Sequence, residues 1–203
     1  MTQKRKLPAG WRWERLGEMG TLSQGGTPST NNPEYWNGKI PFITGADVTE
    51  LFVSKGRSFL TEEGLASGKT ERCEKGDLLI VSRTGVGRIG ISDATIGISQ
   101  DVSVIKLMDG YSPKYLAMYL KSISKKLEEA SQGATIKGLT RSFIENLRIP
   151  LPPTPDDQIP IANELERKLA EVEKMRQASN KQLEAVEALS KAILNEVFDF
   201  EKE

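Results

Sequence analysis

The sequence predicts an α+β protein with a globular mixed domain over residues 1–155 and a long helical region over residues 156–203. Short β-branched runs separated by Gly, Asn, Pro and Ser fill the first part. Five prolines between residues 149 and 160 interrupt the chain. Apolar residues then recur at heptad spacing. We therefore expect a twisted sheet with accessory helices, followed by one long C-terminal helix in an antiparallel coiled coil.

The expected elements of the globular part are short. Apolar runs that end at turn-forming residues predict strands over residues 40–43, 78–81, 89–91 and 102–107. Helical stretches with polar starts are expected over residues 61–67, 113–130 and 140–146. The proline-rich segment RIPLPPTPDDQIP is expected to leave this part as an extended edge strand.

A glycine-rich string, LLIVSRTGVGRIGI, contains Gly85, Gly87 and Gly90 in G-x-G-x-x-G spacing. That spacing binds a dinucleotide when a strand precedes it and a helix follows, because the helix N-terminus supplies the free N–H groups. The downstream sequence ISDATIGISQDVSVIKL is typical of short strands instead. We interpret the string as a turn between two strands, flanked by Arg83 and Arg88, which suit a polyanion. A nucleotide-binding enzyme remains an alternative, and it predicts a helix after Gly90.

Composition favours binding over catalysis. The chain has no histidine, which excludes histidine-based triads, histidine general bases and the usual zinc sites. Its single cysteine, Cys73, allows no disulfide within the chain and no cysteine metal cluster. No pair of acidic residues lies in an apolar frame. We expect no catalytic residue, metal, cofactor or small-molecule substrate. With no apolar run of membrane length, we also expect no membrane association and a cytoplasmic protein.

The balanced net charge hides an uneven distribution. Residues 1–155 carry 21 Lys and Arg against 16 Asp and Glu, a net charge of +5. Residues 156–203 carry 7 against 12, a net charge of −5. A mildly basic body with an acidic extension suits a polyanion-binding domain on an arm that does not touch the polyanion.

The C-terminal region predicts one helix of about forty residues, roughly 60 Å long. We expect its N-cap at Asp156 or Asp157, which leaves Pro160 in the first turns. The heptad stripe has Arg176, Ser179 and Ser190 at its polar positions, and Met175 and Leu189 broaden it. Its apolar members are Leu165, Leu169, Val172, Leu183, Val186, Ile193 and Val197. The helix either folds back over its own domain or forms a coiled coil with another chain. We favour the coiled coil, because so long an arm needs an equally long partner.

Specific strings, in order along nearly the whole chain, resemble the DNA-specificity subunit of type I restriction-modification systems. They are LPAGWRWERLGEM, QGGTPSTNNPEYWNGKIPFITGADV, TEEGLASG, GDLLIVSRTGVGRIG and QGATIKGLTRSFIENLRIPLPPTPDDQIPIANEL. In that family a target-recognition domain reads one half of a split DNA sequence, and long helices hold two such domains apart. The usual subunit has two of each.

The resemblance implies a half-sized subunit that pairs with a second copy through residues 158–197. Two identical readers would prefer an interrupted inverted repeat in double-stranded DNA. It also implies that adenine methylation and DNA cleavage belong to partner methyltransferase and restriction subunits. The string LPPT lacks both ends of the amino-methyltransferase motif, and no Walker A motif occurs.

The predicted DNA-binding residues lie on three segments. Arg83 and Arg88 would make bidentate hydrogen bonds to guanine or bind a phosphate. The small residues beside them would allow the protein backbone to approach a phosphate closely. The other segments are the loops GGTPSTNN and QGATIKGLT. The complete set is Arg83, Thr84, Gly85, Gly87, Arg88, Gln132, Thr135, Lys137, Thr27 and Ser29.

Each segment also has an ordinary explanation: surface arginines paired with acids, a helix C-cap and turn, and a solvated loop. Trp11, Trp13, Tyr35 and Trp36 are expected to pack rather than to stack on bases. The runner-up function is a coiled-coil scaffold whose globular domain binds protein.

Overall fold

The computed structural model describes residues 6–132 and 138–198. The chain divides into two compact units, Met1–Ala162 and Asn163–Glu203. The first unit therefore includes the start of the long helix, beyond the domain boundary expected after residue 155. The predicted α+β class is confirmed.

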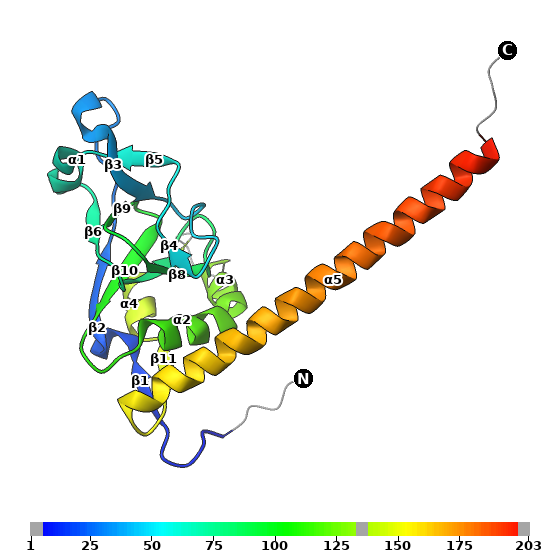
Figure 1. Ribbon diagram of the computed structural model, residues 1–203. Coiled ribbons are helices and arrows are strands. Elements are labelled where there is room, and N and C mark those ends of the chain that lie inside the picture. Colours follow the sequence, from blue (N-terminus) through cyan, green and yellow to red (C-terminus); the bar gives the residue numbers. More distant parts are fainter. Residues whose placement is uncertain (1–5, 133–137, 199–203) are drawn as a thin grey trace. The chain divides into compact units, whose positions relative to one another are not determined.

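A five-stranded sheet forms the centre of the first unit (Figure 1). Its neighbours pair antiparallel except β4 and β8, which are parallel. The middle strand, β7, is buried along its whole length, as the apolar run LLIV predicts. In spatial order the strands are β2 (Gly20–Gln24), β10 (Val102–Leu107), β7 (Leu78–Val81), β8 (Ile89–Ser92) and β4 (Phe52–Val53).

A second sheet and a two-stranded ribbon complete the strands. The sheet has the order β5 (Ser58–Leu60), β3 (Trp36–Ile43), β9 (Ile96–Ile98) and β6 (Glu71–Cys73). The ribbon pairs β1 (Arg12–Arg15) antiparallel with β11 (Arg148–Leu151). The expected edge strand in the proline-rich segment is therefore β11. All four predicted strand regions fall within observed strands.

Alternation along β7 divides the core in two. Leu78 and Ile80 belong to the cluster that includes Leu116 and Leu120 of α2 (Pro113–Ser122). Leu79 and Val81 belong to the cluster shared with β3 and β9. Successive strand residues point to opposite faces, so the central sheet has helix α2 on one face and the second sheet on the other. Packing on both faces of the central sheet fixes the positions of the loops at the ends of β7, β8 and β10.

The helices of the first unit have polar N-caps, as their sequences predict. Thr61, Ser112 and Thr140 each accept a hydrogen bond from a backbone N–H of the first turn. Short 3₁₀ turns lie at η1 (Leu16–Glu18) and η2 (Pro33–Tyr35). The remaining helices are α1 (Glu62–Ala66), α3 (Ser124–Gln132) and α4 (Arg141–Glu145).

The prediction of a single helix over residues 113–130 is wrong. Helix α2 ends at Ser122, and α3 begins at Ser124 after a break at Ile123. The Ser122 hydroxyl donates to the Tyr119 carbonyl at 2.6 Å, and a serine that bonds backward in this way weakens helix continuation. The break redirects the chain so that Leu127 joins the core.

The long helix α5 runs over Gln158–Phe198, 41 residues. The helix begins at the residue after Asp157, one of the two positions expected for its N-cap. Thr154 caps the 3₁₀ turn η3 (Pro155–Asp157), and the Asp157 carboxylate accepts from the Thr154 hydroxyl at 2.7 Å. This capping box lets the helix continue from η3. Within the first unit, Gln158 donates to the Gly110 carbonyl at 2.9 Å and accepts from the Ser112 N–H at 3.0 Å.

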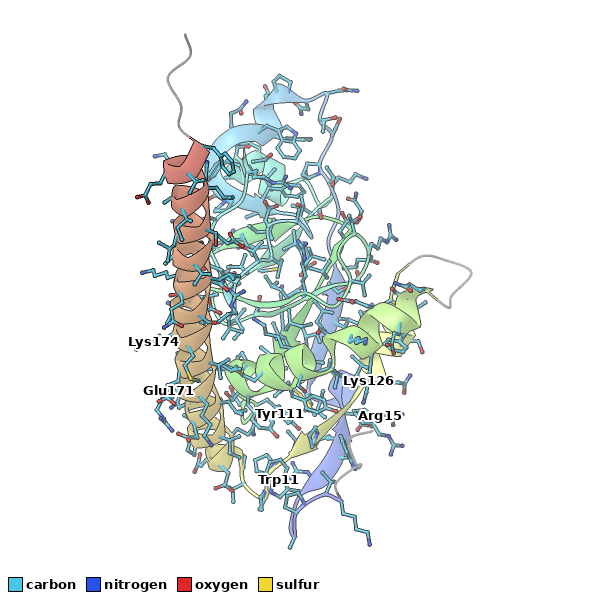
Figure 2. All side chains as sticks on the ribbon, turned by 90° about the vertical axis from the view of Figure 1, so that its right-hand side faces the viewer. Trp11, Arg15, Tyr111, Lys126, Glu171 and Lys174 are labelled. Atoms are coloured by element: carbon cyan, nitrogen blue, oxygen red, sulfur yellow. The ribbon has the colours of Figure 1, made fainter. Side chains whose placement is uncertain are left out.

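From residue 163 onward the apolar stripe of α5 is exposed. Leu165 is 41% exposed and Leu169, Leu183, Val186 and Ile193 are between 52% and 61% exposed. The polar faces carry ion pairs within the helix, such as Arg167 with Glu171 at 2.6 Å. Figure 2 shows Glu171 and Lys174 among the side chains along α5. Among the described residues, no helix is both long and apolar enough to cross a membrane.

Candidate nucleic-acid interface

The glycine-rich string forms a turn between β7 and β8. Gly85 and Gly87 have φ angles of +88° and +90°, in the region that favours glycine. Strand β8 begins at Ile89, so no helix follows, as we predicted. Gly90 is required for packing, since a Cβ there would lie 2.7 Å from Val53 Cγ2. The G-x-G-x-x-G spacing therefore arises from a turn and a close strand contact, which removes the helix that the nucleotide-binding alternative requires.

The tight turn between β9 and β10 holds the glycine turn in place. The Asp101 carbonyl accepts hydrogen bonds from the backbone N–H groups of Ser82 and Arg83, at 2.8 and 3.4 Å. The Ser82 hydroxyl also donates to this carbonyl, at 3.3 Å. The Thr84 hydroxyl lies 3.5 Å from the Asp101 carboxylate. The start of the glycine turn is thus tied to the N-terminus of a central strand.

The same β9–β10 turn also holds the loop after β2. The Thr27 hydroxyl donates to the Gln100 side-chain carbonyl at 2.6 Å, and the Gln24 amide donates to the Gln100 backbone carbonyl at 3.0 Å. Two predicted segments, more than fifty residues apart in the chain, therefore meet through residues 99–101. Ser29 lies further along this loop, where its carbonyl accepts from the Trp36 indole at 3.0 Å.

A cavity of about 810 Å³ opens beside the glycine turn. Gln132, at the C-terminal end of α3, lines it together with predicted residues of the turn. Figure 2 shows Lys126 on the same helix. The lining comprises Arg83, Thr84, Gly85, Val86, Arg88, Asp101, Glu128, Ser131, Gln132 and Gly138. Thr135 and Lys137, which were also predicted to bind DNA, lie outside the described residues.

Arg83 and Arg88 have different surroundings. Arg88 Nη1 donates to the carbonyls of Gly45 and Ala46, at 3.1 and 3.4 Å, and so links the glycine turn to the loop after β3. The exposed side chain of Arg83 makes no hydrogen bond or ion pair with residues 6–132 or 138–198. Arg83 lines the cavity, and its guanidinium has no hydrogen-bond or ion-pair partner in that part of the chain, which leaves it able to bind a ligand.

An internal ion pair braces the loop to which Arg88 is bonded. The Asp47 carboxylate accepts from the Thr44 N–H at 2.9 Å, the Thr44 hydroxyl at 2.6 Å and the Arg57 guanidinium at 2.8 Å. Burial raises the pKa of Asp47, but the hydrogen bonds from Thr44 and the charge and hydrogen bond of Arg57 outweigh it, so the pKa is lowered overall. Asp47 is therefore ionised at neutral pH, where it accepts the hydrogen bonds from Thr44 and Arg57.

Gly87 has a packing role. A Cβ at this position would lie 2.8 Å from the Ser124 carbonyl oxygen and 3.2 Å from Glu128 Cγ. The buried glycine thus lets the turn lie against α3, which brings Gln132 to the cavity. Its contribution to the site is the placement of its neighbours.

Sequence reasoning did not identify Gln100, Asp101 or Glu128. Gln100 and Asp101 belong to a short polar turn between two apolar runs, which resembles any strand connection. Glu128 is an exposed helix residue that also lines the cavity. No spacing in the sequence brings these residues together, because they meet only through the packing of α3 on the glycine turn.

Comparison with known proteins identifies the family. The sequence pattern described as "Type I restriction modification DNA specificity domain" matches residues 8–185. The chain belongs to this family. The resemblance seen in the ordered strings is therefore confirmed at the level of the specificity-domain family.

Two curated relatives of this specificity domain are named specificity subunits. The MjaIX subunit of Methanocaldococcus jannaschii is 32% identical over 166 residues, covering 79% of this chain and 38% of the relative. The EcoR124I/EcoR124II subunit of Escherichia coli is 26% identical over 147 residues, covering 69% and 36%. The chain thus matches less than half the length of these relatives.

Solved structures share the whole fold of this specificity domain. A chain from a study of "complex assembly and conformational transition of the type I R-M system" has a TM-score of 0.80 at 25% identity, with 98% of this chain and 48% of that chain covered. The HsdS subunit from Thermoanaerobacter tengcongensis has a TM-score of 0.72 at 26% identity, with 98% and 47% covered. The α+β fold with its long C-terminal helix is therefore that of HsdS-type structures.

Proposed function

We propose that this specificity domain binds double-stranded DNA in a sequence-specific manner and directs partner subunits to their target. The observation that carries the proposal is that the Thr27 loop and the glycine turn are both hydrogen-bonded to the β9–β10 turn, beside a cavity that Arg83 lines. The Arg83 side chain has no hydrogen-bond or ion-pair partner among residues 6–132 and 138–198. Loops held at strand ends present side chains to a large ligand while the sheet keeps their spacing. Membership in the DNA-specificity family supports duplex DNA as that ligand.

The predicted residues divide into contacting and supporting groups. Arg83, Thr84, Thr27, Ser29 and Gln132 are proposed to contact phosphates or base edges, because arginine, hydroxyl and amide groups make most such contacts. The remaining described residues, Gly85, Gly87 and Arg88, are proposed to shape the loop. Thr135 and Lys137 remain predicted contacts.

Chemistry is proposed to reside in other subunits. The relatives named above are specificity subunits of restriction enzymes. By analogy, this chain would position a methyltransferase subunit that modifies adenine and a restriction subunit that cleaves. It would itself act without a catalytic residue, metal or cofactor.

The long helix is proposed to pair with a second copy in an antiparallel coiled coil. Support comes from its exposed apolar stripe, which offers a seam at heptad spacing over more than thirty residues. The proposed dimerisation residues are Leu165, Leu169, Val172, Leu183, Val186, Ile193 and Val197. Two identical readers related by a two-fold axis would select an interrupted inverted repeat.

Fluorescence anisotropy of labelled duplexes tests the DNA-binding function. Affinity should fall steeply with salt, because bound phosphates release counterions. Competition with unrelated duplex then separates specific from non-specific binding. A chain that dimerises but shows no salt-sensitive affinity for duplex would favour the protein-binding scaffold instead. A methylation map with an asymmetric split target would contradict the symmetric pair alone.

A further inference from the structure

A carboxylate stands in the middle of the proposed DNA-binding surface. Asp101 is half-buried and lines the cavity with Arg83 and Thr84, and Glu128 lines it from α3. Ionised carboxylates only accept hydrogen bonds, and phosphate oxygens also only accept. Asp101 and Glu128 therefore offer no hydrogen bond to a phosphate, in contrast to Arg83 on the same lining. The part of the cavity beside Asp101 suits a group that donates.

The exocyclic amino groups of bases supply such donors in DNA. Cytosine presents its N4 amine and adenine its N6 amine at the major-groove edge, whereas guanine and thymine present only acceptors there. Adenine presents an acceptor beside its amine, and the guanidinium of Arg83 is a donor that lines the same cavity as Asp101. The donor and acceptor content of the cavity thus complements an amine-bearing base edge.

Main-chain bonds fix the position of Asp101. Its N–H donates to the Ser99 hydroxyl at 3.3 Å, and its carbonyl accepts from Ser82 and Arg83. Buried strand β10 begins at the next residue. By contrast, within residues 6–132 and 138–198 the carboxylate has only the long 3.5 Å hydrogen bond from the Thr84 hydroxyl. The backbone bonds of Asp101 therefore do not involve its carboxylate, which leaves that group available to a ligand.

We propose that Asp101 is a specificity-determining residue that accepts a hydrogen bond from the exocyclic amine of one adenine or cytosine in the target. This inference rests on the proposed function. It assigns to Asp101 the selection of a base, while Arg83 and the hydroxyl groups supply affinity.

The test compares the full 203-residue chain with its Asp101→Asn variant in selection from a random duplex library. The variant gains a donor and loses the charge at unchanged size. Preference for an amine-bearing base should fall about tenfold or more at one position of each half-site, in line with the discrimination of a good side-chain–base contact. Preferences at the other positions and the salt slope should stay the same, since no phosphate contact is lost.

Asp93→Asn serves as the matched control. Asp93 is exposed, pairs with Lys75 at 2.8 Å and does not line the cavity. This variant should retain every base preference.

A base analogue locates the contact. If the position is adenine, purine lacks only the amine; wild type should bind the purine-substituted site about tenfold more weakly, and Asp101→Asn should show little further loss. If it is cytosine, an analogue without the N4 amine replaces purine. Equal losses for wild type and variant would contradict the proposed contact.

The possible outcomes distinguish failure of this inference from failure of the proposed function. A wild-type chain that enriches no sequence contradicts the proposed function itself. Enrichment by wild type with unchanged base preferences in Asp101→Asn overturns the inference alone. Asp101→Ala should show the same relaxation at the same position. Loss of folding in both Asp101 variants would overturn it too, because the carboxylate would then be structural.

Discussion

The guanidinium groups of Arg83 and Arg88 lie on one turn, yet their contacts assign them different roles. Arg83→Ala should weaken duplex binding for all sequences and lower the salt slope by about 1 if the lost contact is a phosphate. Its melting temperature should stay close to the wild-type value, since the Arg83 side chain makes no hydrogen bond or ion pair with the described residues. Anisotropy titrations at several salt concentrations measure the first effect and thermal denaturation the second.

Arg88→Ala is the matched comparison. It removes the hydrogen bonds to the Gly45 and Ala46 carbonyls. A lost bond from a charged group costs roughly 1–3 kcal/mol, and each kcal/mol lowers the melting temperature by about 2–4 °C at this size. Loss of DNA binding with an unchanged melting temperature would show that Arg88 contacts DNA directly.

Asp47 gives the loop after β3 a pH dependence. Burial raises the pKa of its carboxyl, but the hydrogen bonds from Thr44 and the bond and charge of Arg57 lower it by more, so that the folded value lies below the ordinary 3.8. A lowered folded pKa means that the stabilisation is present above pH 3.8 and is lost as the pH falls through the folded value. Asp47→Asn should therefore be less stable than wild type at neutral pH, with a gap that narrows in acid. Urea denaturation at a series of pH values measures the gap, and a constant gap would contradict this role.

At the scale of elements, the exposed stripe of α5 predicts a sharp effect of charge. Leu183→Asp combined with Val186→Asp places carboxylates in the middle of the proposed seam, where burial of an unpaired charge is strongly unfavourable. The proposed dimer should become monomeric, which light scattering would show. Ala188→Asp makes the same kind of change on the opposite face of the helix and should leave the mass unchanged. A double variant that stays dimeric would exclude this stripe as the seam.

Most elements could be predicted from local patterns. The strands at β7 and β10 match their apolar runs to the residue, and the caps Thr61 and Thr140 mark their helices. The break at Ile123 could not be predicted, because Ser122 and Ser124 are tolerated in many helices. Burial of Leu127 against a core assembled from distant strands decides it.

For the whole molecule, the two units predict different results for two truncations. A chain ending at Ala162 keeps the Gln158 bonds to the loop before α2 and the buried Ala162 side chain. A chain ending at Pro155 loses both. Both should be monomers, but the shorter one should melt at a lower temperature, as calorimetry would show. Equal melting temperatures would mean that the start of α5 adds no stability to the first unit.

The candidate site could be predicted only in part, because its segments meet through the folding of the whole first unit. Arg83, Thr84 and Gly85 lie in one visible string, and Thr27 lies in a second polar loop. Their connection runs through the β9–β10 turn, which places Gln100 and Asp101 between them. The proximity of these loops depends on the order of the strands in the sheet. Strand order is set by long-range packing rather than by local sequence.

Sequence-specific binding by a pair of chains can be tested by selection of duplexes with the purified 203-residue chain, followed by binding of the selected sequence across salt concentrations. We expect enrichment of two related half-sites at a fixed spacing, bound by a dimer with salt-dependent affinity. Binding that shows no preference among sequences at any salt concentration would contradict this expectation.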